Sequence, residues 1–94
     1  GELVVTAGVN SLIAEDEDFA RHVKSSLVRH ASSDWGDMSA EDKKENDFSI
    51  DKHLRIFSAY IIPGRPDKSV AQEKIWIITE ADRSVTTVLF PDEY

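Results

Sequence analysis

Two groups of polar and charged side chains in this sequence have types and spacings that could support chemistry. The first is the segment 80–84, which includes Glu80, Asp82 and Arg83 and lies between two apolar runs. A guanidinium at the end of a strand can bind an anion or stabilise negative charge in a transition state. Asp and Ser are also common turn residues, because their side chains form hydrogen bonds with the nearby backbone. The segment indicates either an anion site built on Arg83 or an ordinary hairpin turn, and the pattern favours the turn.

The second group is the segment 29–37, which begins at the end of a predicted long helix. As a catalytic site, it would use His30 as a general base and Arg29 to hold an anionic transition state. As a structural feature, His30 would lie partly buried at the helix end, where a protonated ring interacts favourably with the helix dipole. The pattern favours the structural interpretation.

Four residues are candidates for contact with a partner: Asp34, Trp35, Asp37 and Arg83. We expect the indole of Trp35 to be buried against the preceding helix, near Leu27 or Ala31. A buried aromatic anchor contributes several kcal/mol, roughly 3–5 on truncation to alanine. An exposed Trp35 would instead be a recognition platform, and its removal would hardly change stability.

The sequence does not indicate a metal or cofactor site. The chain has no cysteine, and its three histidines lack an i, i+4 pair, so a zinc site is not expected. The acids of the segment 34–45 lack the spacing of a calcium-binding loop, and helix capping accounts for several of them. A glycine-rich phosphate loop and a nucleophile elbow are also missing from the sequence.

The elements that would position these groups follow the order of an α+β fold. A β-rich run at residues 2–7 precedes two helical patterns, one with an apolar stripe through Phe19 and Val23, the other from about Ala40 to Ile50. Three apolar runs follow, at residues 54–62, 75–80 and 85–90. We expect two helices packed on a four-stranded, mainly antiparallel sheet, in the order β-α-α-β-β-β, with residues 1–94 forming a single domain.

The composition predicts a small acidic globular protein. Hydrophobic residues make up 40% of the 94 residues and charged residues 31%. The net charge of −7 makes nucleic-acid binding an unfavourable hypothesis, because Lys and Arg contacts to phosphates supply most of that affinity. No apolar run reaches the roughly 18 residues of a membrane span, and the first residues do not have the pattern of a signal peptide. We expect a cytoplasmic protein.

Several short words of the sequence resemble a family of short bacterial proteins labelled plasmid-related. The words are "DWGD", "SAY", "IWIITEADRS", "LFP" and the final "EY", and the resemblance covers residues 4–94. The chain departs from the family at residues 63–73, where its polar loop is longer. Members are carried on plasmids, prophages and integron gene cassettes and have no established activity. The resemblance therefore implies a mobile genetic element and no particular reaction.

The predicted order of elements also resembles small microbial ribonucleases such as barnase and the RelE-type toxins. That resemblance implies catalytic roles for His30, Arg55, Glu80 and Arg83 in metal-independent cleavage of RNA. It is an analogy of fold alone. The acidic balance of the chain makes this the alternative hypothesis rather than the preferred one.

The preferred hypothesis is a small, non-enzymatic, acidic binding or regulatory module that acts through a protein partner and needs no cofactor. A third hypothesis is self-association. The run at residues 2–7 is expected at an edge of the sheet and carries one charge, Glu2. Unpaired strand edges can pair with a second copy, which would give a homodimer.

Overall fold

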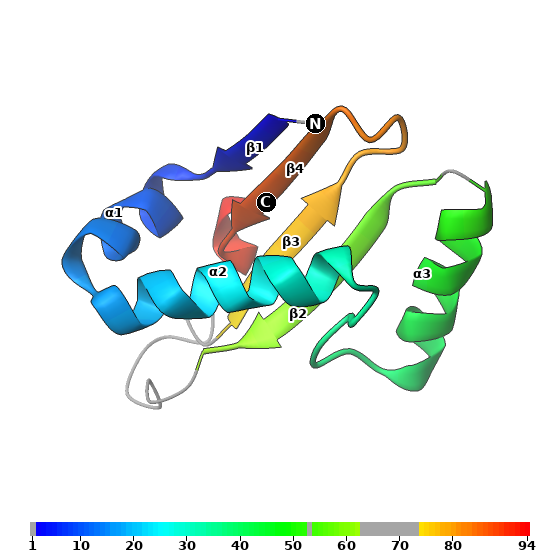
Figure 1. The fold of residues 1–94 in the computed structure, drawn as a ribbon, viewed down its shortest axis with the longest axis horizontal. Helices are drawn as coiled ribbons and strands as arrows, with labels where there is room; N and C mark the ends of the chain where they lie inside the picture. The colour runs from blue at the N-terminus through cyan, green and yellow to red at the C-terminus, as the bar shows by residue number, and fades with distance from the viewer. Residues whose placement is uncertain (1, 53, 63–73) are drawn as a thin grey trace.

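A computed structural model describes residues 2–52, 54–62 and 74–94 (Figure 1). The elements in chain order are β1 (Glu2–Val5), α1 (Ala7–Glu15), α2 (Glu17–Ala31), α3 (Ala40–Lys52), β2 (Ile56–Ile61), β3 (Lys74–Thr79), β4 (Val85–Leu89) and the 3-10 helix η2 (Pro91–Glu93). The α+β class that the sequence predicts is confirmed. The predicted polar loop at residues 63–73 lies outside the described residues.

The four strands form one mixed sheet in the order β1-β4-β3-β2. The two pairs β2–β3 and β3–β4 are antiparallel, as the sequence predicts, whereas β1 pairs with β4 in parallel. The sheet is therefore mainly antiparallel, with β1 at one edge and β2 at the other.

Helix α1 is an element that the sequence interpretation lacked, since it expected two helices. Val9 is fully buried, and Leu12 and Ile13 pack against the same core, so the apolar spacing in this segment is helical. Asp16 separates α1 from α2 because its carboxylate accepts hydrogen bonds from the amides of Asp18 and Phe19, at 3.0 and 3.1 Å. Asp16 thus caps the start of the helix that carries the predicted apolar stripe, and a further helix precedes it.

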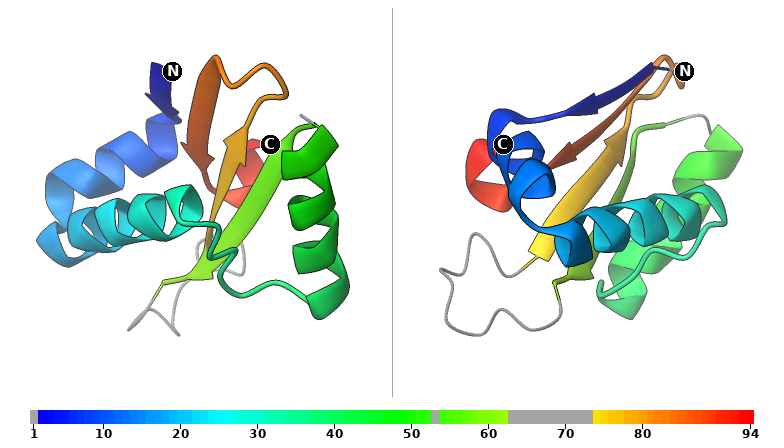
Figure 2. Two further views of the ribbon diagram at one scale, coloured as in Figure 1. Left: turned by 45° about the vertical axis from the view of Figure 1, so that its right-hand side comes forward. Right: turned by 60° about the vertical axis from the view of Figure 1, so that its left-hand side comes forward.

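The core lies between the sheet and the first two helices. Helix α2 crosses one face of the sheet with α1 beside it, and α3 stands next to β2 (Figures 1 and 2). Phe19 and Val23 of the predicted apolar stripe are buried. They pack in one cluster with side chains from β2, β3, β4 and the residue after β4: Tyr60, Ile75, Ile77, Val88 and Phe90.

The outer edge of β2 is closed by side chains and backbone that come from outside the sheet. The side-chain amide of Asn46 in α3 accepts from the Phe57 amide at 3.2 Å and donates to the Phe57 carbonyl. Asp37 donates its amide to the Ala59 carbonyl at 2.7 Å, and its carboxylate accepts from the Ile61 amide at 2.9 Å. The β2 edge therefore offers few free backbone groups for pairing.

The β1 edge is more open than the β2 edge. The Glu2 amide donates to the carbonyl of Ser84, just before β4, and the Thr6 amide donates to the carbonyl of Val88 within β4. Leu3 and Val5 therefore direct their backbone groups away from the sheet. The Leu3 side chain is 55% exposed. A homodimer through this edge stays a prediction.

The C-terminal turn is attached to the start of α1 through one carboxylate. Glu93 accepts hydrogen bonds from the Thr6 hydroxyl at 2.6 Å, the Gly8 amide at 2.9 Å and the Phe90 amide at 3.2 Å. Partial burial acts to raise the pKa of Glu93, but these three hydrogen bonds outweigh it and lower the pKa below its ordinary value. The carboxylate therefore holds both ends of the described chain together.

We expect Glu93→Gln to lower the free energy of unfolding by about 1 kcal/mol at pH 7, because a neutral amide is a weaker acceptor. The folded-state pKa of Glu93 lies below its unfolded value, so its contribution is complete above the unfolded pKa and is lost as the pH falls through the folded one. Urea unfolding of both proteins between pH 7 and pH 3 should show the difference shrinking below about pH 4. A difference that stays constant over this range would contradict the expectation.

Candidate functional site

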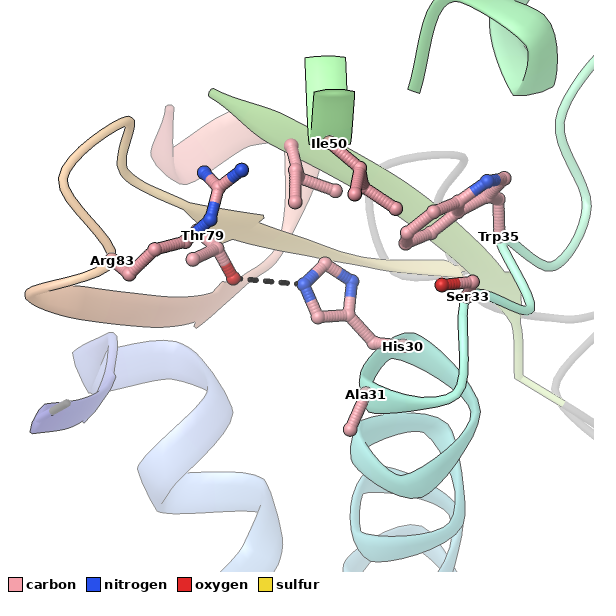
Figure 3. Close-up of a pocket in the computed structure, with 8 residues that line it drawn as sticks. His30, Ala31, Ser33, Trp35, Ile50, Thr79 and Arg83 are labelled. Atoms are coloured by element: carbon pink, nitrogen blue, oxygen red, sulfur yellow. Dashed lines mark hydrogen bonds between the residues drawn. The ribbon is translucent and has the colours of Figure 1, made fainter. Parts of the chain in front are cut away.

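An open cavity of about 390 Å³ lies where the end of α2, helix α3 and the tip of the β3–β4 hairpin meet. Helix α2 and the connection after it supply one wall, Ile50 of α3 a second, and the ends of β2 and β3 the floor (Figure 3). The residues that line the cavity are His30, Ala31, Ser33, Trp35, Ile50, Ile56, Thr79 and Arg83. Its size suits a single side chain or a small organic group.

His30 is held in the cavity by two hydroxyl groups from the sheet. Its Nδ1 lies 2.5 Å from the Ser58 hydroxyl and its Nε2 lies 2.8 Å from the Thr79 hydroxyl. The Thr79 hydroxyl in turn lies 2.9 Å from that of Thr86 on β4. Both ring nitrogens are thus engaged, and the side chain is 8% exposed.

Burial lowers the pKa of His30 to about 4, so the ring is neutral at physiological pH. His30 is buried in the last turn of α2, as the structural interpretation expected, and the favourable contact of a protonated ring with the helix dipole would apply only below this pKa. The dipole contributes about 0.3–1 kcal/mol to a cation in the last turn, which is less than the cost of burying that charge. A neutral imidazole has one donor and one acceptor nitrogen, and Ser58 and Thr79 satisfy both.

Trp35 is 4% exposed, so the predicted burial of its indole is confirmed. Its ring meets the edge of His30 with 5.7 Å between centroids, so the contact on α2 lies one residue before Ala31. The indole Nε1 donates to a carboxylate oxygen of Asp47 in α3 at 3.1 Å. Trp35 therefore joins α2 to α3 and forms one end of the cavity (Figure 3).

The other two candidate contact acids, Asp34 and Asp37, make structural contacts outside the cavity lining. Asp34 accepts from Arg29 Nε at 2.8 Å and Nη2 at 3.2 Å, and from the Gly36 amide at 3.2 Å. These interactions, led by the Arg29 hydrogen bond, lower the pKa of Asp34. Asp37 caps the β2 edge. The structure thus places Trp35 and Arg83 on one cavity and the two acids elsewhere.

Arg83 takes part in a turn and also lines the cavity. Its backbone has φ +63°, and the turn is closed by hydrogen bonds from the Glu80 amide to Val85 at 3.0 Å and from the Arg83 amide to Glu80 at 2.9 Å. Its Nη1 donates to three backbone carbonyls, those of Leu54 (2.7 Å), Glu80 (3.2 Å) and Ala81 (3.4 Å). The segment 80–84 is therefore a turn, and it directs a guanidinium to the cavity.

The four residues of the ribonuclease hypothesis lie in two places. His30 and Arg83 line the cavity, whereas Arg55 and Glu80 lie outside its lining. Arg55 Nε is 3.7 Å from a carboxylate oxygen of Glu80, and both side chains are 46% exposed. An ion pair this exposed contributes about 0–1 kcal/mol.

The sequence interpretation missed the hydroxyl groups of Ser58 and Thr79. Both lie on the core face of their strands, where they alternate with apolar residues such as Ile56, Tyr60 and Ile77. Their position on the apolar face of each strand could have predicted two buried hydroxyl groups. A buried hydroxyl needs a hydrogen-bond partner, and here the partner is His30.

Ser33 and Arg83 are the non-glycine residues with positive φ in the part of the chain that the structure describes, and both line the cavity. Ser33 has φ +63° and follows α2, where its amide donates to His30 at 3.2 Å and the Asp34 amide donates to Arg29 at 2.8 Å. This pair of bonds is the Schellman motif, in which glycine is the preferred residue at the left-handed position.

We expect Ser33→Gly to raise the free energy of unfolding by about 0.5–1 kcal/mol, because it relieves a left-handed conformation that costs a side chain about 1 kcal/mol. The matched control is Ser32→Gly, which should be destabilising, since Ser32 has φ −95° and its hydroxyl donates to the Val28 carbonyl. Chemical denaturation gives the free energy of unfolding of the two variants and of the natural sequence. A loss of stability in Ser33→Gly would refute the strain at this position.

The chain matches no protein-family model, no curated protein and no solved structure. Within residues 2–52, 54–62 and 74–94, no group of three His, Asp or Glu side chains is arranged to hold a metal ion. The same residues include no helix with the length and apolar character of a membrane span.

Proposed function

We propose that this chain is a small, non-enzymatic, cytoplasmic binding module that acts through a protein partner. The mobile-element setting implied by the sequence resemblance is part of the same proposal. The contact site is the cavity between α2, α3 and the β3–β4 hairpin. The observation that carries the proposal is the state of His30, which is buried, neutral and hydrogen-bonded at both nitrogens.

The cavity has the properties of a binding site rather than those of a catalytic site. General acid–base catalysis needs a side chain with a pKa near the operating pH and a free position within hydrogen-bond reach of the substrate. His30 meets neither condition, and no carboxylate is among the described residues that line the cavity. The walls are apolar, with Trp35, Ile50 and Ile56, so they favour burial of an apolar group at about 25 cal/mol per Å².

The charge and the surface near the cavity favour a protein as the partner. The net charge of −7 repels a nucleic-acid backbone and attracts a basic protein surface. Ile50 is 38% exposed at the cavity, and Leu54, whose carbonyl binds Arg83, is 46% exposed. An apolar side chain of a partner would fill the cavity and cover these residues.

A selection from a random peptide library tests this proposal with two matched variants. Ile50 and Phe48 are both exposed apolar residues of α3, but Phe48 lies outside the cavity lining. Peptides selected on the natural sequence should lose binding to Ile50→Asp and keep it on Phe48→Asp. Unfolding midpoints of both variants would show that each is folded.

Two results would overturn the proposal. One is selected peptides that bind equally well to Ile50→Asp, because the cavity would then not be the contact site. The other is cleavage of structured or unstructured RNA in EDTA by the natural sequence, lost in Arg83→Gln. That result would favour the metal-independent ribonuclease with His30, Arg55, Glu80 and Arg83.

A further inference from the structure

We propose that the cavity recognises the free C-terminal carboxylate of its protein partner, with the partner's last apolar side chain inside the cavity. This inference rests on the proposed function and specifies its ligand. The guanidinium of Arg83 has two edges with different surroundings.

One edge of the guanidinium is fixed by the protein. Nη1 donates to the carbonyls of Leu54, Glu80 and Ala81, which hold the side chain in place. Nε and Nη2 have no hydrogen-bond partner among the residues that the structure describes. These two N–H groups form the side-on fork of an arginine, and a carboxylate matches that fork with two parallel hydrogen bonds.

The polar side-chain groups of His30, Thr79 and Trp35 at the cavity already have hydrogen-bond partners. His30 and Thr79 bond to each other and to Ser58 and Thr86, and the Trp35 Nε1 donates away from the cavity to Asp47. The free fork of Arg83 therefore stands out as a charged donor beside an apolar cavity. A ligand that fits must combine an anionic acceptor with an apolar body.

Arg83 and Trp35 lie at opposite ends of the cavity, with Ile50 between them (Figure 3). A C-terminal residue carries its carboxylate and its side chain on the same Cα, so one residue can reach both the Arg83 fork and the apolar walls. An acidic side chain would need a second residue to fill the cavity. The net charge of −7 also opposes a partner surface rich in acids, whereas one terminal carboxylate on a neutral or basic segment is tolerated.

Three small probes distinguish a terminal carboxylate from a side-chain carboxylate and from none. N-acetylleucine has a terminal carboxylate, N-acetylleucinamide has none, and the capped dipeptide amide of leucine and glutamic acid has one on a side chain. Methyl NMR of Ile50 and Ile56 reports binding in the cavity. We expect N-acetylleucine to bind roughly tenfold or more tightly than the other two, since charge-assisted hydrogen bonds to the fork distinguish them.

Three variants test the role of Arg83. Arg83→Gln should remove the preference for the free acid, and Arg55→Gln, which makes the same change in net charge outside the cavity lining, should keep it. Arg83→Lys keeps the charge and a donor for the Leu54 carbonyl but lacks the fork, so it should also lose most of the preference.

Equal affinities for the acid and the amide on the natural sequence would overturn the inference and leave the proposed function standing, because the cavity would still bind an apolar group. Stronger binding of the glutamyl dipeptide amide would overturn the terminal carboxylate as the source. No shift with any probe up to its solubility limit would also overturn the inference, and the peptide selection would then decide the proposed function separately.

Discussion

Gly36→Ala is expected to be the most destabilising small substitution in the connection between α2 and α3. Gly36 has φ +75°, a conformation that strains any side chain. A Cβ at this position would collide with the Ala59 carbonyl oxygen and lie 2.6 Å from Cδ1 of Tyr60. Tyr60 is fully buried and Ala59 belongs to β2, so neither can move aside. We expect a loss of about 3–5 kcal/mol from overpacking and backbone strain together.

Denaturant unfolding of Gly36→Ala measures this loss directly. Gly8→Ala is the matched control, because a Cβ there meets the carboxylate of Glu93, the far end of a flexible side chain, at 2.9 Å. The control should change the free energy of unfolding much less than Gly36→Ala does. If both variants unfold near the midpoint of the natural sequence, the close approach of residues 35–37 to β2 is contradicted.

Trp35→Ala is expected to cost about 3–5 kcal/mol, the usual cost of truncating a buried aromatic side chain. The indole is 4% exposed, packs on His30 and donates to Asp47, so its removal opens a void between α2 and α3. In a domain with a total stability of about 5–15 kcal/mol, this loss is severe.

Trp35→Phe separates the two contributions of the indole. It keeps an aromatic ring against His30 but removes the hydrogen bond to Asp47, so it should cost less than Trp35→Ala. Thermal unfolding of the natural sequence, Trp35→Phe and Trp35→Ala gives the order of their stabilities. A shift of only a degree or two for Trp35→Ala would show that the indole is a surface platform rather than an anchor.

The sequence predicted the class of fold and most of its elements because their signals are local. The apolar stripe through Phe19 and Val23 and the three apolar runs of the last strands depend on short periodic patterns. Helix α1 was missed because residues 2–7 were interpreted as one β-rich run, whereas α1 begins at Ala7 and Val9, Leu12 and Ile13 have helical spacing. The β-rich composition of residues 2–7 favoured a strand, whereas the apolar spacing that follows favoured a helix. The helix forms because its apolar residues pack on the core.

The site was less predictable because its properties depend on contacts between distant segments. The burial of Trp35 was predicted, but its partner Asp47 lies in α3, and Asn46 binds α3, which supplies one wall of the cavity, to β2. The neutral state of His30 depends on burial against Ser58 and Thr79, which no local pattern around His30 encodes.

The proposal that the cavity binds a partner and does not catalyse a reaction depends on the neutral state of His30. NMR titration of its imidazole nitrogens between pH 3 and pH 8 measures that state. The pKa of His30 in the folded protein is lowered from 6.5 to about 4 by burial, so the stability it contributes is present above about pH 6.5 and is lost as the pH falls toward 4. We expect one neutral tautomer from pH 8 down to about pH 5 and a titration midpoint near 4. A midpoint at 6.5 or above, with a ring nitrogen that exchanges freely with solvent, would contradict this expectation and make His30 available as a general base.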